Sequence, residues 1–245
     1  MILLPAIDIL DGKAVRLAQG SFDEQTVYDA DPVEAAVRWA SAGARALHVV
    51  DLDGARSGRP VNLETVRRIV TEVDLPIQLG GGLRTIEAVR DAVDAGVTRV
   101  VLGTAAYTDV DFIDSVVAEI GDRAVVSVDA RDGYLAASGW LEQTRIPVNT
   151  VIERMNDRGI RRFVYSSIDR DGVLAGPDLE AAVEVAGSVR GSFIYSGGVA
   201  SLEDLRALAG LRQVNLSGVI VGKALYEGRF TVQQAQTLLD RTRPA

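Results

Sequence analysis

Four short motifs occur twice in this chain of 245 residues, in the same order and roughly 120 residues apart. The first copies are Ile7–Gly12, Asp53-Gly54 with Gly58, Leu79–Gly82 and Val101–Ala105. The second copies are Val128–Gly133, Asp171-Gly172 with Gly176, Tyr195–Gly198 and Ile220–Ala224. A repeated order at a nearly constant offset indicates two similar halves. We therefore expect one domain over 1–245, built from halves of roughly 1–120 and 121–245.

Eight short apolar runs rich in β-branched residues alternate with stretches that have helical spacing. The expected strands are Ile2–Ile7, Ala46–Val50, Pro76–Leu79, Arg99–Leu102, Ala124–Val128, Arg162–Tyr165, Ser192–Tyr195 and Gly218–Val221. Such alternation indicates parallel βα units, in either a closed barrel or an open doubly wound sheet. The number of strands, the length and the missing G-x-G-x-x-G motif favour the α/β fold of a single (β/α)8 TIM barrel. The expected helix caps are Asp31, Asn62, Thr85, Asp109 and Ser201.

Composition excludes several kinds of chemistry. Cysteine is absent and His48 is the only histidine, which excludes disulfides, thiolate nucleophiles and metal sites made of cysteines or paired histidines. The net charge of −8 argues against nucleic-acid partners and anionic membrane surfaces, and no apolar run reaches the roughly 18 residues of a membrane span. We expect a cytoplasmic monomer that leaves acid–base work to carboxylates.

Asp8 ends the first expected strand and Asp129 ends the fifth. These strands face each other across an eight-stranded barrel, whose active site lies at the carboxyl ends of its strands. Two carboxylates on either side of one ligand suit a general base and a general acid, one of which needs a pKa raised by burial. A turn or cap is the alternative for each residue alone, but the repetition favours catalysis. Asp11 and Asp132, each before a glycine, are expected in turns.

Glycine-rich loops follow the third, fourth, seventh and eighth expected strands. Glycine allows backbone N–H groups to approach an anion, and a following helix adds the positive end of its dipole. A tight turn explains one such loop, but two paired sets predict a substrate with a phosphate at each end. The expected phosphate-binding residues are Gly81, Gly82, Gly103, Thr104, Gly176, Gly197, Gly198, Gly222 and Lys223.

Six further residues are candidates for positioning the substrate, and each also has a structural explanation. They are Arg16, His48, Asp51, Trp140, Ser166 and Arg170. His48 suits either a core position or the rim, and Trp140 either packs or stacks on a planar ring from a loop. Ser166 and Ser167 point to opposite sides of their strand, so only one of them faces the site.

The motifs resemble those of HisA, the family of histidine-biosynthesis isomerases that act on the bis-phosphorylated compound ProFAR. The resemblance covers essentially the whole chain and is carried by Pro5–Asp8, Asp11–Lys13, His48–Ala55, Leu79–Arg84, Val101–Ala105 and Val219–Ala224. It implies an Amadori rearrangement of the aminoaldose ProFAR to the aminoketose PRFAR, without a metal or an organic cofactor. In that family Asp8 matches the proton acceptor and Asp129 the proton donor.

One departure from the family, and one from a close variant of it, bear on the alternatives. Ser167 stands where an aspartate is usual, in a stretch that is more like the paralogous HisF cyclase. The PriA isomerases, which also act on phosphoribosyl anthranilate in tryptophan biosynthesis, usually have an arginine where Ser138 stands. This favours an isomerase of ProFAR alone over the bifunctional type. A HisF-like cyclase and a non-catalytic barrel that binds phosphate ligands are the remaining alternatives.

Overall fold

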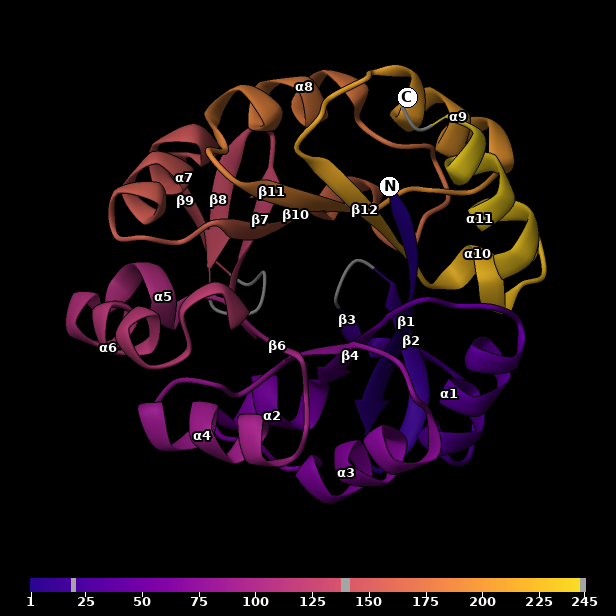
Figure 1. The fold of residues 1–245 in the computed structure, drawn as a ribbon, viewed down its shortest axis with the longest axis horizontal. Helices are drawn as coiled ribbons and strands as arrows, with labels where there is room; N and C mark the ends of the chain where they lie inside the picture. The colour runs from indigo at the N-terminus through magenta and orange to yellow at the C-terminus, as the bar shows by residue number, and fades with distance from the viewer. Residues whose placement is uncertain (19–20, 138–141, 243–245) are drawn as a thin grey trace.

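Eight parallel strands close into a ring in the computed structural model, which describes residues 1–18, 21–137 and 142–242 (Figure 1). In ring order they are β1 (Ile2–Leu10), β4 (Leu47–Asp51), β5 (Ile77–Gly80), β6 (Arg99–Leu102), β7 (Ala124–Arg131), β10 (Arg162–Ser167), β11 (Ser192–Ser196) and β12 (Leu216–Val221). Parallel pairing of β12 with β1 closes the ring. The expected strands and the (β/α)8 barrel are confirmed, and the open sheet is wrong.

The helices surround the ring (Figure 1). They are α1 (Pro32–Ser41), α2 (Leu52–Ser57), α3 (Leu63–Glu72), α4 (Ile86–Asp94), α5 (Ala105–Thr108), α6 (Val110–Ile120), α7 (Val148–Asp157), α8 (Leu179–Ser188), α9 (Leu202–Gly210), α10 (Lys223–Tyr226) and α11 (Val232–Arg241). In the described part of the chain, none is long and apolar enough to cross a bilayer.

Four of the five expected helix caps form. Side chains of Asp31, Thr85, Asp109 and Ser201 each accept a hydrogen bond from a backbone N–H in the first turn of the helix that follows. Asn62 occupies the N-cap position of α3 but does not cap it. Its amide donates instead to Asp51 at the end of β4 and to Asp53 of α2, so this expectation is wrong.

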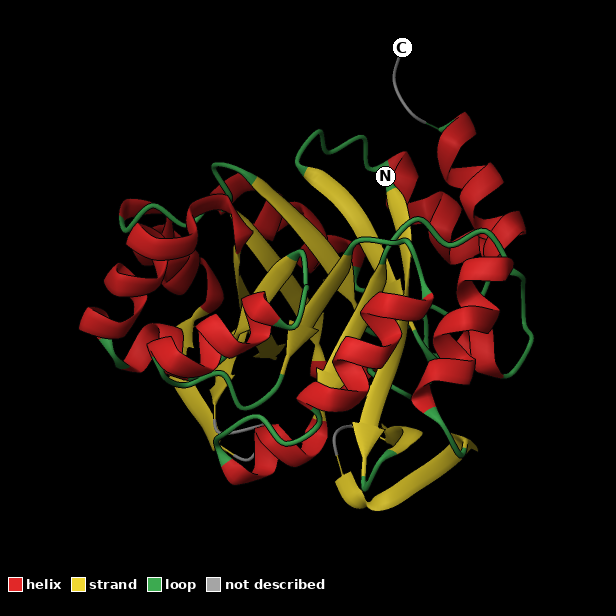
Figure 2. Ribbon diagram, turned by 60° about the horizontal axis from the view of Figure 1, so that its bottom comes forward, coloured by secondary structure: helices red, strands yellow, loops and turns green. Residues whose placement is uncertain are grey.

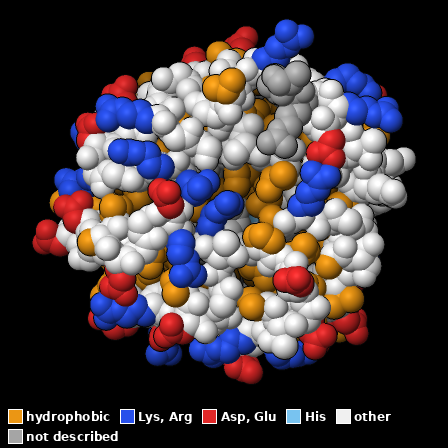
Figure 3. Space-filling view, in the orientation of Figure 1, with side chains coloured by type: hydrophobic (Ala, Val, Ile, Leu, Met, Phe, Trp, Pro, Cys, Tyr) orange, Lys and Arg blue, Asp and Glu red, His pale blue; other side chains and the backbone are white. Residues whose placement is uncertain are grey.

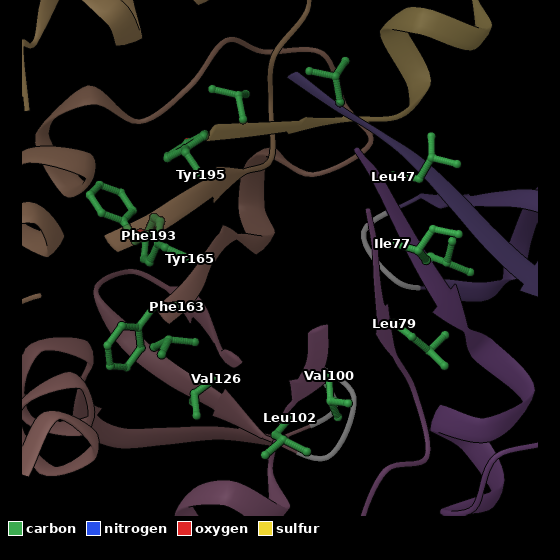
Figure 4. Packing of buried hydrophobic residues seen from close by; sticks show 14 of the residues in the cluster. Leu47, Ile77, Leu79, Val100, Leu102, Val126, Phe163, Tyr165, Phe193 and Tyr195 are labelled. Atoms are coloured by element: carbon green, nitrogen blue, oxygen red, sulfur yellow. The ribbon is translucent and has the colours of Figure 1, made fainter. Parts of the chain in front are cut away.

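Alternation along the strands divides their side chains between two apolar layers. The outward layer packs under the helices and includes the ring of residues seen in Figure 4, such as Leu47, Ile77 and Phe163. The inward layer fills the barrel with Leu4, Ala6, Ala46, Val101, Val125, Val164, Ile194 and Ile220. Each large buried side chain contributes about 1.5–3 kcal/mol. Because the side-chain period is two, these residues also fix which polar neighbours point into the barrel.

Two antiparallel hairpins interrupt the βα order and were not expected. β2 (Lys13–Ala18) and β3 (Ser21–Asp29) follow β1, and β8 (Tyr134–Ala137) and β9 (Glu142–Pro147) follow β7. Each begins with an Asp-Gly turn at positive φ, Asp11-Gly12 at 49° and 73° and Asp132-Gly133 at 50° and 77°. The two expected turns are therefore confirmed. In Figure 2 a strand hairpin projects from the end of the barrel opposite the labelled N-terminus.

The sequence repeat is also a repeat of backbone conformation. Gly81 and Gly197 have φ angles of 104° and 103°, and Gly82 and Gly198 have 74° and 81°. The built Cβ of Gly81 would lie 2.1 Å from the carbonyl oxygen of Asp51, and that of Gly197 would lie 2.5 Å from that of Ser167. Both halves therefore need glycine here because neighbouring loops approach closely.

Candidate active site

Asp8 points into the barrel near the carboxyl end of β1. It lies two positions after Ala6, an inward residue, and it is only 9% exposed. Its Oδ2 accepts a hydrogen bond from Nη1 of Arg16 at 2.8 Å. Burial raises the pKa of Asp8 to about 6, Arg16 acts in the opposite direction, and the charge of Asp171 adds to the rise. A carboxyl with this pKa can accept a proton near neutral pH.

Arg16 lies between two carboxylates. It comes from the hairpin strand β2, and its Nη2 is 4.0 Å from Oδ1 of Asp171, which follows β10. Burial raises the pKa of Asp171, while Arg16 lowers it and Asp129 adds to the rise. The Nε of Arg16 is buried and has no hydrogen-bond partner in the structure. The arrangement provides an unused cationic donor between two acids.

Asp129 occupies the opposite side of the barrel. Its strand, β7, is separated from β1 by three strands in either direction around the ring. Asp129 lies four positions after inward Val125, and its Oδ1 accepts a hydrogen bond from Oγ of Ser127 at 2.8 Å. Burial, and then the negative charge of Asp129, raise the pKa of Tyr107, a tyrosine of α5. Asp8 and Asp129 thus flank the carboxyl end of the barrel from opposite strands.

His48 lies on the inward side of β4, in register with Ala6 of β1. Its Nδ1 is 2.7 Å from Nε2 of Gln78, and since an amide nitrogen can only donate, Nδ1 accepts. Burial and then the charge of Arg16 lower the pKa of His48 to about 3, so the ring is neutral near pH 7. A neutral ring with Nδ1 as acceptor has its proton on Nε2 and can act as a donor there.

Ser166 and Ser167 are both buried, and they separate as expected. Ser166 lies two positions after inward Val164 and is in register with Asp129, so it faces the site. Ser167 has the opposite orientation, where its hydroxyl contacts that of Tyr195. The position at which the family usually has an aspartate therefore points away from the site, and this departure removes no carboxylate from it.

The glycine loops after β11 and β12 meet around one small cavity of about 20 Å³. Its walls include Gly197, Gly198, Gly222 and Lys223, together with Arg16 and Asp171. Lys223 Nζ donates to the carbonyl oxygen of Gly172 at 2.8 Å. The guanidinium of Arg16 covers Gly222 so closely that a built Cβ would lie 2.4 Å from its Cζ. The cationic side chains of Arg16 and Lys223 thus lie beside the loops that were expected to bind a phosphate.

The loops of the first half differ from one another. Gly82 would place a Cβ 2.6 Å from the backbone of Arg59, so its φ of 74° serves close packing of loops. Gly103 has no heavy atom within 4 Å of the position that a Cβ would take, so no close packing requires glycine there. Thr104 precedes the short helix α5, and its hydroxyl contacts that of Tyr107.

Three residues that were expected to bind the ligand have a clear structural role. The buried carboxylate of Asp51 accepts four hydrogen bonds from the loop after β4, three of them from backbone N–H groups. Arg170 donates to the carbonyl oxygens of Ala175 and Gly176, and Gly176 has a φ of 82°. These contacts shape the loops, while a contact with the substrate stays a prediction. Trp140 and Ser138 lie outside the described residues.

Four residues of the site were not in the expected set. Asp171 is the most informative, because its Asp-Gly motif is part of the repeat but only the structure places its carboxylate beside Arg16. Ser127 could have been found from its spacing of two before Asp129 on a strand. Gln78 and Tyr107 carry no signal in the sequence. Among the described residues, no group of three or more acids or histidines is placed to hold a metal ion.

Comparisons with known proteins agree with this geometry. The family model described as histidine biosynthesis protein matches residues 2–231. A relative from Desulforudis audaxviator is 48% identical over 97% of this chain and 91% of its own length. Relatives from Roseiflexus castenholzii and Bacillus pumilus are 47% and 41% identical over 96% and 98% of this chain, and each is covered over 98% of its own length.

All three relatives are named 1-(5-phosphoribosyl)-5-((5-phosphoribosylamino)methylideneamino) imidazole-4-carboxamide isomerase. The compound in this name is ProFAR. The matched region spans every strand of the barrel and both carboxylates. The resemblance inferred from the motifs is therefore confirmed, and the chain belongs to the histidine biosynthesis protein family.

Proposed function

We propose that this chain is an isomerase that converts the aminoaldose ProFAR into the aminoketose PRFAR. The observation that carries the proposal is the pair Asp8 and Asp129, held at the carboxyl ends of opposite strands in a barrel of this family. The names of the relatives identify the substrate class. They give no support to a cyclase or to a barrel that only binds.

Asp129 is the general acid in the proposed mechanism. It donates a proton to the ring oxygen of the aminosugar, the bond from C1 to that oxygen breaks, and the nitrogen lone pair forms a protonated imine at C1. Ser127 holds one carboxylate oxygen at 2.8 Å and so orients the group. Ser166, in register with Asp129 on the next strand, is placed to hold the opened chain.

Asp8 is the general base. It removes the proton from C2 of the protonated imine; the C–H electron pair forms the C1–C2 double bond, and the electrons of the C=N bond return to the nitrogen, which gives a neutral enolamine. The enol O–H then loses its proton while C1 gains one, which leaves the ketone at C2. Arg16 favours the ionised form of Asp8, so a pKa of about 6 leaves the base mostly ionised at pH 7. A positioned acid or base typically contributes a factor of about 10²–10⁴.

The phosphate at one end of the substrate is proposed to bind where Arg16 and Lys223 meet the loops after β11 and β12. The other is proposed to bind the loops after β5 and β6, at Gly81, Gly82, Gly103 and Thr104. Backbone N–H groups and cations both favour such anions. The two loop sets follow strands on opposite sides of the ring, which suits an elongated substrate with a phosphate at each end.

The same proposal includes a monomer in the cytoplasm with no nucleic-acid or membrane partner. The two proton transfers assigned to Asp129 and Asp8 use only side chains of this chain, so the mechanism calls for no metal or organic cofactor. The negative overall charge supports the exclusion of nucleic acid. A single peak near 26.1 kDa in light scattering is expected for the monomer.

The decisive experiment assays the purified chain separately with ProFAR and with phosphoribosyl anthranilate. Turnover of ProFAR alone is expected. Turnover of both would identify the bifunctional PriA type and show that Ser138 does not discriminate. Turnover of neither by folded protein would overturn the isomerase, and a cyclase assay with ammonia would then test the HisF-like alternative.

A further inference from the structure

The end of the barrel opposite the proposed active site carries two inward arginines. Arg99 is the first residue of β6, and Arg162 is the first residue of β10. Val101 and Val164, two positions further along each strand, belong to the inward apolar layer. Alternation therefore directs both arginines toward the barrel axis. Only β7 separates their strands, so the two side chains converge.

Figure 3 shows this end of the molecule, with basic side chains near the centre of the ring. Arg99 and Arg162 are both partly buried. Arg123, directly before β7, lies at the edge of the same group and donates to two backbone carbonyl oxygens ahead of β6. We call Arg99, Arg123 and Arg162 the basal arginines.

The charges of this group are not balanced by acids. Among the described residues, Arg99 and Arg162 form no ion pair with a carboxylate. Arg162 Nε donates to the backbone oxygen of Asp122 at 3.0 Å, which leaves its terminal nitrogens available. Burial and the charge of Arg162 both lower the pKa of Arg99. Two partly buried like charges repel each other, and an anion between them would remove that cost.

An anion here would be separate from the substrate. The inward apolar layer, which includes Leu4, Val101, Val125, Val164 and Ile194, lies between the basal arginines and the carboxyl ends of the strands. Neither Asp8 nor Asp129 is part of the group. The site would also exist if the proposed isomerase activity were absent.

We propose that the basal arginines bind a doubly charged oxyanion, either inorganic phosphate or the phosphate group of a small metabolite. Guanidinium groups offer paired N–H donors in a planar fork that matches phosphate oxygens, and partial burial strengthens such bonds. The convergence of Arg99 and Arg162 provides two forks for one anion. Arg123, with its guanidinium already bonded to backbone, contributes charge at the edge.

Thermal unfolding of the full chain tests the proposal. Melting temperatures are compared in chloride and in roughly 20 mM phosphate at matched ionic strength, for wild type, Arg99→Gln, Arg162→Gln and the control Arg206→Gln. Arg206 is an exposed residue of α9 that pairs with Glu203, and it neither belongs to the basal arginines nor lines the cavity at the loops after β11 and β12. Phosphate also binds the proposed active site, but that contribution is equal in all four proteins. The difference between wild type and variant therefore reports the basal arginines.

For phosphate at about ten times its Kd, wild type and Arg206→Gln should gain about 3 °C more than Arg99→Gln or Arg162→Gln. Activity should stay within about twofold in all variants, since the apolar layer separates the two ends. Equal gains in all four proteins, or an equal gain from chloride, would overturn the proposal. Arg99→Lys keeps the charge without the fork and should retain part of the gain; it also replaces Arg99→Gln if that variant fails to fold.

A second arm uses ribose 5-phosphate in place of inorganic phosphate. A similar variant-dependent gain would identify the phosphate group of a metabolite as a ligand. A gain with inorganic phosphate alone would restrict the site to the free ion. No variant-dependent gain with either compound would exclude both forms of the proposal.

Discussion

The two halves of the barrel have similar backbone conformations, but side chains at equivalent positions have different roles. The Asp-Gly motifs after β4 and β10 show this best. Asp53 is buried and accepts hydrogen bonds from the backbone N–H of Asp11 and from the side chains of Asn62 and Arg56. Its counterpart Asp171 instead faces Arg16 at 4.0 Å. The carboxylate of Asp53 therefore holds a loop in place, whereas that of Asp171 adds a negative charge to the candidate active site.

The paired carboxylates differ in the same way. Asp8 is buried beside Arg16, and its pKa is raised to about 6. Asp129 is more exposed, has a serine as its hydrogen-bond partner and lacks an arginine at hydrogen-bond distance among the described residues. The repeated scaffold thus places two carboxylates at equivalent positions, and they differ in burial and in hydrogen-bond partners. Acid–base catalysis requires this difference, because one group must release a proton where the other accepts one.

The largest expected effect comes from removing either carboxylate. Asp8→Asn and Asp129→Asn should each lower kcat for ProFAR by at least about a hundredfold, because an amide can neither accept nor donate the proton. Circular dichroism and melting temperature check that both variants fold. Near-wild-type turnover by one variant would remove that residue from the mechanism and reduce the symmetric pair to a single group.

The second prediction compares the equivalent positions Asp171 and Asp53: substitution should mainly reduce activity at Asp171 and mainly reduce stability at Asp53. Asp171→Asn should lower kcat/KM by about tenfold or more with little change in melting temperature, because the substitution removes charge beside Arg16. Asp53→Asn should cost about 2 kcal/mol, or about 5 °C, because its new amide group meets donors on both sides. Its activity should be less affected. Equal losses of activity would contradict the division of roles between the halves.

The third effect concerns the acid limb of the pH profile. The proposed role of Asp8 as a base requires its ionised form, and its pKa is raised to about 6, so kcat/KM should fall about tenfold per pH unit below that value. Arg16 opposes the rise, so Arg16→Gln should move the limb to higher pH whatever it does to the absolute rate. Arg206→Gln is a matched surface control. A limb that stays in place in Arg16→Gln would show that Asp8 does not set it.

The fold could be predicted because its signals are local and repeated. Apolar runs of strand length, Asp-Gly turns and capping residues are all signals that act within a few positions. The repeated motifs of the two halves also indicate where the strands end. The hairpins after β1 and β7 were missed although Asp11-Gly12 and Asp132-Gly133 mark two-residue turns. The Asp-Gly pairs predict the turns but not the strands around them, because these strands are additional to the alternating βα units.

The site was predictable only in part, for a physical reason. Asp8, Asp129 and the glycine loops lie at strand ends, where topology alone brings residues together. The partners of Asp8 come from a hairpin and from a loop on the far side of the barrel, so no spacing in the sequence connects Arg16 with Asp171. The same holds for Asp51, which accepts three of its four hydrogen bonds from Val61 and Asn62, about ten residues later.

The smallest effect compares the caps of α4 and α9, which follow equivalent strands. Thr85 accepts one hydrogen bond from the first turn of α4, whereas Ser201 forms a capping box with Asp204, which returns a bond to the backbone N–H of Ser201. Replacing either by alanine should cost about 1 kcal/mol, or about 2–4 °C, and leave kcat unchanged. Ser201→Ala should cost more because Asp204 then loses its reciprocal partner while still bound to the backbone. Equal losses in urea unfolding would mean that the box adds nothing to a single bond, and the two halves would be alike at this position.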